Sequence, residues 1–237
     1  MIKLTIDEGN TTTKLALFDD KELLTKEMDV SKSRCLELAS ECDRLILSSV
    51  KKDSQYKLSI DNKRLLVLDS NTPIPISNTY NTPHSLGNDR IALAVGAHEH
   101  FPNHNVLAID AGTCITYDFV NAQSEYIGGG ISAGIQMRYT ALHQFTSQLP
   151  LLSPLENPPL TGKDTAESIH SGVINGIISE IDGIIQRYSE QHPEIRVIAT
   201  GGDAKFFDKG LKNTIFANPN LLMEGLNKIL DYNESYF

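Results

Sequence analysis

Cysteine, basic residues and long apolar stretches are all scarce in this sequence, and each scarcity argues against a class of protein. The cysteines Cys35, Cys42 and Cys114 lack the spacing of metal ligands, so a reducing cytoplasm is the expected compartment. Lys and Arg number 21 against 30 Asp and Glu, a formal net charge of −9. Without a basic cluster, neither nucleic acid nor an anionic membrane is an expected partner. No apolar run reaches the roughly 18 residues of a membrane-spanning helix.

Two motifs are also absent. The start of the chain does not resemble a secretion signal, because Asp7 interrupts the first apolar stretch. The sequence has no Gly-x4-Gly-Lys-Ser/Thr motif, and this excludes the P-loop as a means of binding nucleotide phosphates. Any phosphate site must therefore be built from other residues.

One short pattern occurs twice, half a chain apart. Leu4-Thr5-Ile6-Asp7-Glu8-Gly9-Asn10-Thr11 is echoed by Leu107-Ala108-Ile109-Asp110-Ala111-Gly112-Thr113, and an alternating apolar run follows each copy. Each copy predicts a strand, a tight turn and a second strand. A single copy is typical of an ordinary hairpin. Two copies favour two similar lobes that offer a carboxylate, a hydroxyl and backbone N–H groups to a nucleotide triphosphate and its metal ion.

Apolar runs of strand length alternate with helical patterns along the chain, which predicts an α/β protein. The pattern breaks at Pro102 and the polar residues around it, so we expect lobes at residues 1–104 and 105–237. Residues 71–86 lack periodicity and contain three prolines, and a loop of this length is typical of functional segments. Strands are predicted at residues 2–6, 14–18, 44–48, 64–68, 106–109, 114–120, 125–127 and 196–199, and helices at 33–42, 91–99, 133–148, 164–188 and 220–230.

Further motifs, in this order, make the chain similar to the type III pantothenate kinases, a family of the acetate and sugar kinase/Hsp70/actin superfamily. Besides the two hairpins, the resemblance rests on Asn78-Thr79-Tyr80-Asn81-Thr82-Pro83, Gly87-Asn88-Asp89-Arg90, Gly128-Gly129-Gly130-Ile131, Ala141-Leu142, Leu149-Pro150, Thr165 to Gly172, and Thr200-Gly201-Gly202-Asp203-Ala204. These motifs span nearly the whole chain. Two positions depart from the family pattern: Glu8 replaces the usual apolar residue, and Ser132-Ala133-Gly134 lacks the proline that typically precedes the glycine.

The resemblance implies two ribonuclease H-like lobes of the actin-like ATPase fold, with a nucleotide cleft between them. It also implies ATP-dependent phosphorylation of pantothenate to 4'-phosphopantothenate, the first step of coenzyme A biosynthesis. Mg²⁺, a monovalent cation (K⁺ or NH₄⁺) and a homodimer with shared active sites belong to the same expectation. The alternatives are another acceptor, such as a sugar or acetate, and a non-catalytic nucleotide-binding regulator. The Tyr80 loop argues against the first, and the acids Asp7, Asp89 and Asp110 argue against the second.

The first hairpin is the expected ATP site. Asp7 would hold Mg²⁺ directly or through water, because this ion prefers one or two carboxylates together with phosphate oxygens. Lys14 would meet a phosphate as a point charge, or face solvent as an ordinary strand residue. Glu8 would add negative charge near the metal, or point to solvent. The N–H groups of Gly9 to Thr11 would wrap the phosphates, and the expected ATP-binding set also includes Glu8, Asn10, Thr12, Thr13 and Thr113.

Asp89 is the candidate general base, because it stands at a loop-to-helix junction where a carboxylate can accept the proton of an alcohol. Its alternative role is to cap the helix. Arg90 would bind the carboxylate of pantothenate or a phosphate, or form a surface ion pair. Tyr80 would pack on the substrate, or anchor its own loop.

The remaining candidates follow from the resemblance alone. Gly87, Asn88 and Thr165 correspond to positions that contact pantothenate, and Asp110 corresponds to the ligand of the monovalent cation. On pattern alone, Thr165 is simply the first residue of a helix.

Overall fold

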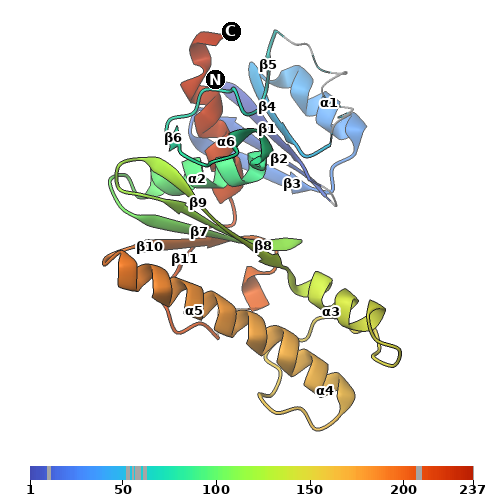
Figure 1. Ribbon diagram of the computed structural model, residues 1–237. Coiled ribbons are helices and arrows are strands. Elements are labelled where there is room, and N and C mark those ends of the chain that lie inside the picture. The colour runs from blue at the N-terminus through green and yellow to red at the C-terminus, as the bar shows by residue number, and fades with distance from the viewer. Residues whose placement is uncertain are drawn as a thin grey trace. The chain divides into compact units, whose positions relative to one another are not determined.

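The computed structural model describes residues 1–9, 12–51, 54, 56, 60, 63–206 and 210–236 (Figure 1). Contacts divide the chain into two compact units. Unit 1 comprises Met1–Asn103, Val120–Gly128 and Asn220–Phe237, and unit 2 comprises His104–Phe119 and Gly129–Pro219. The first break is one residue from the predicted boundary. Two segments of the second half nevertheless belong to unit 1, which differs from the predicted lobes at residues 1–104 and 105–237.

Unit 1 is built on a mixed five-stranded sheet with the order β3-β2-β1-β4-β5. β1 pairs with β2 antiparallel and with β4 parallel, so it is flanked on both sides. β1 is almost entirely buried, and this burial explains why its sequence reads as an apolar run. The strands are β1 Ile2–Glu8, β2 Thr13–Asp19, β3 Glu22–Met28, β4 Arg44–Ser49 and β5 Leu65–Val67.

Helices cover this sheet. Helix α1 (Lys32–Glu41) packs its buried residues into a core with the apolar residues of β1 and β4. Helices α2 (Asn88–His100) and α6 (Leu221–Tyr232) pack on each other so closely that a Cβ on Gly225 would lie 1.9 Å from the carbonyl oxygen of Ala92. The C-terminal helix is fixed to β1, where Lys3 forms an ion pair with Asp231. This packing explains why α6 belongs to unit 1 and not to the unit of the residues that precede it.

The second sheet has the strand order β11-β10-β7-β8-β9-β6. β7 pairs with β10 in parallel, and β10 pairs with the short β11 in parallel. Within unit 1, β6 pairs with the beginning of β9. The strands are β6 Ser77–Asn78, β7 Val106–Ala111, β8 Cys114–Val120, β9 Glu125–Ala133, β10 Arg196–Thr200 and β11 Phe216–Ala217.

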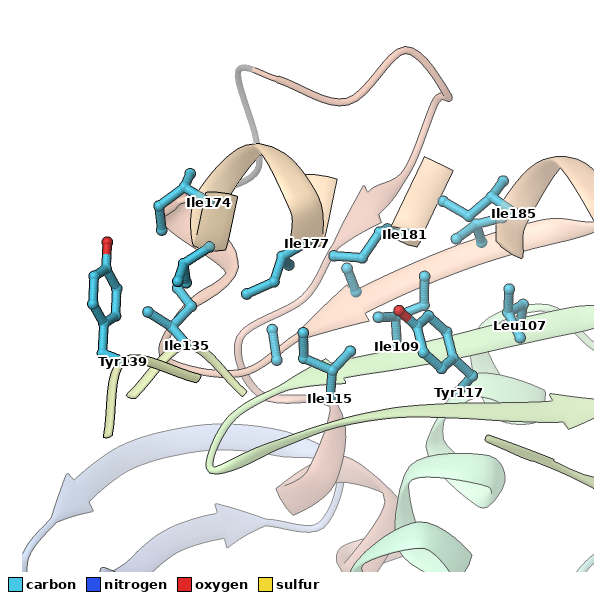
Figure 2. Packing of buried hydrophobic residues seen from close by; sticks show 14 of the residues in the cluster. Leu107, Ile109, Ile115, Tyr117, Ile135, Tyr139, Ile174, Ile177, Ile181 and Ile185 are labelled. Atoms are coloured by element: carbon cyan, nitrogen blue, oxygen red, sulfur yellow. The ribbon is translucent and has the colours of Figure 1, made fainter. Parts of the chain in front are cut away.

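The core of unit 2 lies between its sheet and the long helical segment at residues 165–191. Figure 2 shows Ile177, Ile181 and Ile185 of this segment directed toward side chains of β7 and β8, among them Ile109 and Tyr117. The helix predicted at residues 164–188 is therefore present and buries one apolar stripe. The helix is interrupted by one π turn, so it divides into α4 Thr165–His170, the turn Ser171–Asn175 and α5 Gly176–Gln191. Asp164 caps its start by accepting a hydrogen bond from the N–H of Glu167 (2.8 Å).

The other predicted elements are present with shifted ends, but two details differ. β9 continues through the glycine triplet, because β8 approaches it so closely that a Cβ on Gly129 would lie 1.6 Å from the carbonyl oxygen of Tyr117. Ser132 therefore belongs to β9, and the next helix, α3 Ile135–Gln144, begins two residues later than predicted with Gly134 as its N-cap. In the described part of the chain, no helix is both long and apolar enough to cross a membrane.

Candidate active site

Asp7 is a buried carboxylate on the central strand of unit 1, with 6% of its surface exposed. Its pKa is raised to about 6, chiefly by burial and to a smaller extent by the charge of Asp89. The charge of Lys14, directly opposite on β2, and a hydrogen bond from Ser48 Oγ (3.1 Å) act in the other direction. Lys14 and Asp89 therefore both lie near enough to Asp7 for their charges to act on its carboxylate. A cation would relieve the cost of ionising Asp7 there.

The turn between β1 and β2 is closed by a hydrogen bond from the N–H of Gly9 to the carbonyl oxygen of Thr12 (3.0 Å). The N–H of Gly9 is thus engaged within the turn, which differs from the expectation that it contacts a phosphate. Asn10 and Thr11, the other two residues of the predicted phosphate turn, lie outside the described residues. Thr13 begins β2 opposite Glu8.

Glu8 follows Asp7 on β1, so its side chain points to the opposite face of the sheet. It is buried, accepts a hydrogen bond from Ser49 Oγ (2.8 Å) and forms an ion pair with Lys51 Nζ (3.6 Å). Neither predicted role describes this arrangement, since the side chain neither adds charge beside Asp7 nor points to solvent. The internal partners explain how an acid is tolerated where the family usually has an apolar residue.

Asp89 lies in the first turn of α2, whose N-cap is Gly87. Its Oδ1 accepts a hydrogen bond from the N–H of Arg90 (2.9 Å). A Cβ on Gly87 would lie 2.4 Å from Oδ1 of Asp89. A larger residue at this position would therefore displace the carboxylate from its present position.

Tyr80 and Arg90 form a second part of the unit 1 site. The guanidinium carbon of Arg90 lies 5.8 Å from the ring centroid of Tyr80, within the range of a cation–π interaction. Arg90 is buried, so it does not form the exposed ion pair that was the alternative prediction. The ring of Tyr80 also faces Gly128, where a Cβ would lie 3.3 Å from Cδ2. Asn88 donates a hydrogen bond from Nδ2 to the carbonyl oxygen of Leu68 (2.8 Å).

Unit 2 contains the second hairpin. Asp110 lies near the end of β7, and the N–H of Gly112 donates to the carbonyl oxygen of Cys114 (3.0 Å) to close the turn. Gly201 has a positive φ of 101°, and a Cβ there would lie 2.5 Å from Oδ1 of Asp110. Gly201 is thus packed against the acid of the hairpin. Thr113, at the tip, is exposed.

Thr165 is the first residue of α4 and is exposed. It lines a cavity of about 960 Å³ within unit 2, together with Arg138, Lys163 and apolar residues of α3 and the π turn. The lining combines the cations Arg138 and Lys163, the acid Asp164 and hydroxyl groups with an apolar wall, and Arg138 is ion-paired with Glu180. This composition suits a small ligand that has both polar groups and an apolar body.

The described ranges contain no group of three or more His, Cys, Asp or Glu side chains that could hold a metal ion. Asp7 alone, however, fits a magnesium ion that enters with a nucleotide, because this ion takes most of its remaining ligands from phosphates and water. Oδ2 of Asp7 accepts no hydrogen bond within the described part of the chain and is available for this purpose.

Comparison with known proteins agrees with this chemistry. Residues 3–187 match the family described as type III pantothenate kinase. A type III pantothenate kinase of Christiangramia forsetii is 43% identical over 242 residues, covering 99% of this chain and 100% of the relative. One of Bacteroides fragilis is 44% identical over 240 residues, covering 98% of each.

The chain belongs to the type III pantothenate kinase family.

Solved structures show the fold that this family member shares with more distant proteins. A Campylobacter jejuni protein of the Baf family has a TM-score of 0.67 at 21% identity, covering 98% of this chain and 99% of that chain. The Clostridium difficile activator of 2-hydroxyisocaproyl-CoA dehydratase, solved with bound ADPNP, has a TM-score of 0.52 at 10% identity, covering 100% and 95%. The predicted two-lobed α/β fold of the actin-like class is confirmed.

In this member of the type III pantothenate kinase family, the predicted residues fall into two groups. Unit 1 brings together Asp7, Lys14 and Asp89 and separately pairs Tyr80 with Arg90. Unit 2 holds Asp110, Thr113 and Thr165. Sequence reasoning missed Ser48, which bonds to Asp7. The available signal was its position at the end of the strand that runs parallel to β1.

Proposed function

We propose that this protein transfers the γ-phosphoryl group of ATP to the primary hydroxyl of pantothenate, giving 4'-phosphopantothenate and ADP in the first step of coenzyme A biosynthesis. Identities of 43% and 44% over nearly the full length of two type III pantothenate kinases support this substrate pair. The structural observation that carries the proposal is the charge interaction between Asp7 and Asp89 in unit 1. Phosphoryl transfer needs one acid for the metal and another for the alcohol.

Asp89 orients the hydroxyl and accepts its proton as the new O–P bond forms and the β–γ bridging bond breaks. Its place in the first turn of α2 and the space left by Gly87 support this role. Arg90 attracts the carboxylate of pantothenate, and Tyr80 packs against its apolar part. Gly87, Asn88 and Thr165 complete the proposed substrate set.

Asp7 would hold the Mg²⁺ of the ATP complex, directly or through water. When bound, the ion would supply positive charge that offsets the charge of the triphosphate. Lys14 adds a second positive charge beside the same acid. The turn residues Gly9 to Thr13 with Thr113 contact the triphosphate, Gly9 through atoms other than its N–H, which is bonded to Thr12. The proposed ATP set also contains Glu8, but through its backbone, because its side chain is tied to Ser49 and Lys51.

A monovalent cation at Asp110 is the next part of the proposal. We expect activity to be severalfold higher in K⁺ or NH₄⁺ than in Na⁺ at the same ionic strength, because a protein with a net charge of −9 has few fixed cations to offset a triphosphate. Steady-state rates in the three chloride salts measure this. An Asp110→Asn variant should lose the difference between salts, and an equal rate in all three would remove Asp110 from this role.

A homodimer in the cytoplasm, with neither nucleic acid nor membrane as a partner, completes the proposal. Unit 2 exposes Phe145 (85%), Leu160 (83%) and Ile131 (64%). We take these side chains as the candidate dimer contacts, since contiguous exposed apolar side chains mark interfaces. Thr165 of the proposed substrate set lies in the same unit.

The experiment that tests the function is a coupled assay of ADP release with pantothenate, with sugars and acetate as rival acceptors, and with no acceptor. We expect release to depend on pantothenate, with 4'-phosphopantothenate as the product identified by mass spectrometry. If a sugar or acetate stimulates the release of ADP instead, that compound is the acceptor and pantothenate is not. ATP binding without release under any condition would favour a regulator.

A further inference from the structure

Asp7 is the middle member of a row of three side chains that crosses the unit 1 sheet. In the β1–β2 ladder it stands opposite Lys14, and in the parallel β1–β4 ladder it is in register with Ser48. Ser48 is fully buried, and its Oγ donates a hydrogen bond to Oδ1 of Asp7 (3.1 Å). The row therefore places a cation on one side of the acid and a hydroxyl donor on the other.

We propose that Ser48 is the positioning residue for Asp7: by holding Oδ1, it turns Oδ2 toward the divalent cation that arrives with the nucleotide. This inference rests on the proposed function, because it assumes that Asp7 meets a nucleotide-bound cation. Ser48 itself touches neither the nucleotide nor the ion.

The need for such a residue follows from the geometry of a carboxylate. The terminal torsion of an Asp side chain is broad, so its two oxygens exchange places easily unless one of them is bonded. Within the described residues, Ser48 is the side chain that donates a hydrogen bond to this carboxylate. The backbones of both residues belong to paired strands in the middle of a buried sheet, so neither can shift without disturbing the ladder.

The next position along the same two strands provides an internal control. Glu8 and Ser49 are also in register, and Ser49 Oγ donates to Oε2 of Glu8 (2.8 Å). Because successive side chains of a strand alternate between faces, this second pair lies on the face opposite Asp7. The two serines thus make the same kind of bond in neighbouring positions, but only Ser48 acts on the acid assigned to the cation.

The test compares four variants of the full chain: Ser48→Ala, Ser48→Cys, Ser48→Thr and Ser49→Ala. Binding of Mn²⁺ in the presence of ADP, without pantothenate, is measured by electron paramagnetic resonance. Removing a hydrogen-bond partner of a metal ligand typically weakens metal affinity about 10–100-fold, and we expect that loss in Ser48→Ala. Thr keeps the hydroxyl, so we expect Ser48→Thr to bind within about threefold of wild type. Ser49→Ala should stay within about twofold.

Steady-state kinetics give a second readout. In Ser48→Ala we expect the Mg²⁺ concentration for half-maximal activity to rise by the same factor, with a smaller change in the KM for pantothenate. General loosening of the sheet would change both and would not be repaired by Thr. If Ser48→Ala does not fold, Ser48→Cys replaces it, because a thiol has similar size but is a weak donor.

Wild-type affinity for Mn²⁺ in Ser48→Ala, or in Ser48→Cys where that variant replaces it, would overturn the inference. So would a loss in Ser49→Ala as large as that in the Ser48 variant, or a wild-type protein that does not bind Mn²⁺ with ADP at all. The proposed function fails separately. If Mn²⁺ binding depends on Ser48 but pantothenate does not stimulate ADP release, the positioning role stands and the acceptor is wrong.

Discussion

Replacing Asp7 by Asn is expected to make the protein more stable and nearly inactive. Burial raises the pKa of Asp7 from its ordinary value of 3.8 to about 6. The folded protein therefore binds the proton of Asp7 more tightly than the unfolded chain does. The free energy of unfolding falls as pH rises from about 4 to about 6 and stays lower above that range, by about 3 kcal/mol for a shift of this size.

Asn avoids this cost because it does not ionise, and its side-chain oxygen can still accept the hydrogen bond from Ser48. At pH 7.5, without nucleotide and with chelator, we expect the thermal midpoint of Asp7→Asn to exceed that of wild type by roughly 6–12 °C. At pH 4 the two proteins should unfold at nearly the same temperature. The activity should fall about 10³-fold, because a neutral amide holds the cation of the nucleotide poorly.

Glu8→Gln is the matched control, since it removes the neighbouring acid, whose charge is paired with Lys51. It should not gain stability at pH 7.5. Differential scanning fluorimetry across pH 4–8 and the ADP-release assay make the comparison. If Asp7→Asn is no more stable than wild type at pH 7.5, this would contradict the claim that the buried, ionised Asp7 destabilises the folded protein. A variant that retains most of its activity would remove the acid from the metal site.

Much of the fold could be predicted from sequence because its elements are locally encoded. The strand, turn and strand of both hairpins are present, as is the apolar stripe of α5. β3 was missed because the edge strand Glu22–Met28 is largely exposed and has no clean apolar alternation. The place of α6 could not be predicted, because it depends on contacts such as Lys3 with Asp231 across almost the whole chain.

The candidate site also contains residues that could be predicted from the sequence and residues that could not. Residue type and motif were enough to select Asp7, Asp89 and Arg90. The residues that orient them were not predictable from sequence. Their effect depends on which positions of neighbouring strands are in register, or on the space left where a side chain is absent. Ser48 reaches Asp7 only because β4 runs parallel to β1 in one register. Gly87 matters because it has no Cβ, which would clash with the carboxylate of Asp89. The pairing of Glu8 with Lys51 depends on the path of the chain after β4.

Replacing Asp89 by Asn should lower kcat about 10³-fold while ATP binding and thermal stability remain close to wild type. A general base contributes about 10²- to 10⁴-fold in rate. Asn keeps the shape of the side chain and an oxygen that can accept the bond from the N–H of Arg90, but it cannot take up the proton of the alcohol. Single-turnover phosphorylation of pantothenate and calorimetric titration with ATP measure the two properties separately.

Gly87→Ala tests the same carboxylate without changing its chemistry. Its Cβ would lie 2.4 Å from Oδ1 of Asp89, so the carboxylate must move away from its present position. Because a misplacement of about 1 Å can cost about 10²-fold in rate, we expect a loss of that order in kcat with ATP binding retained. Glu22→Gln, at an exposed acid of β3 in the same unit, should leave kcat unchanged. If Asp89→Asn and Gly87→Ala both turn over within about threefold of wild type, the proton of the alcohol goes to a different acceptor.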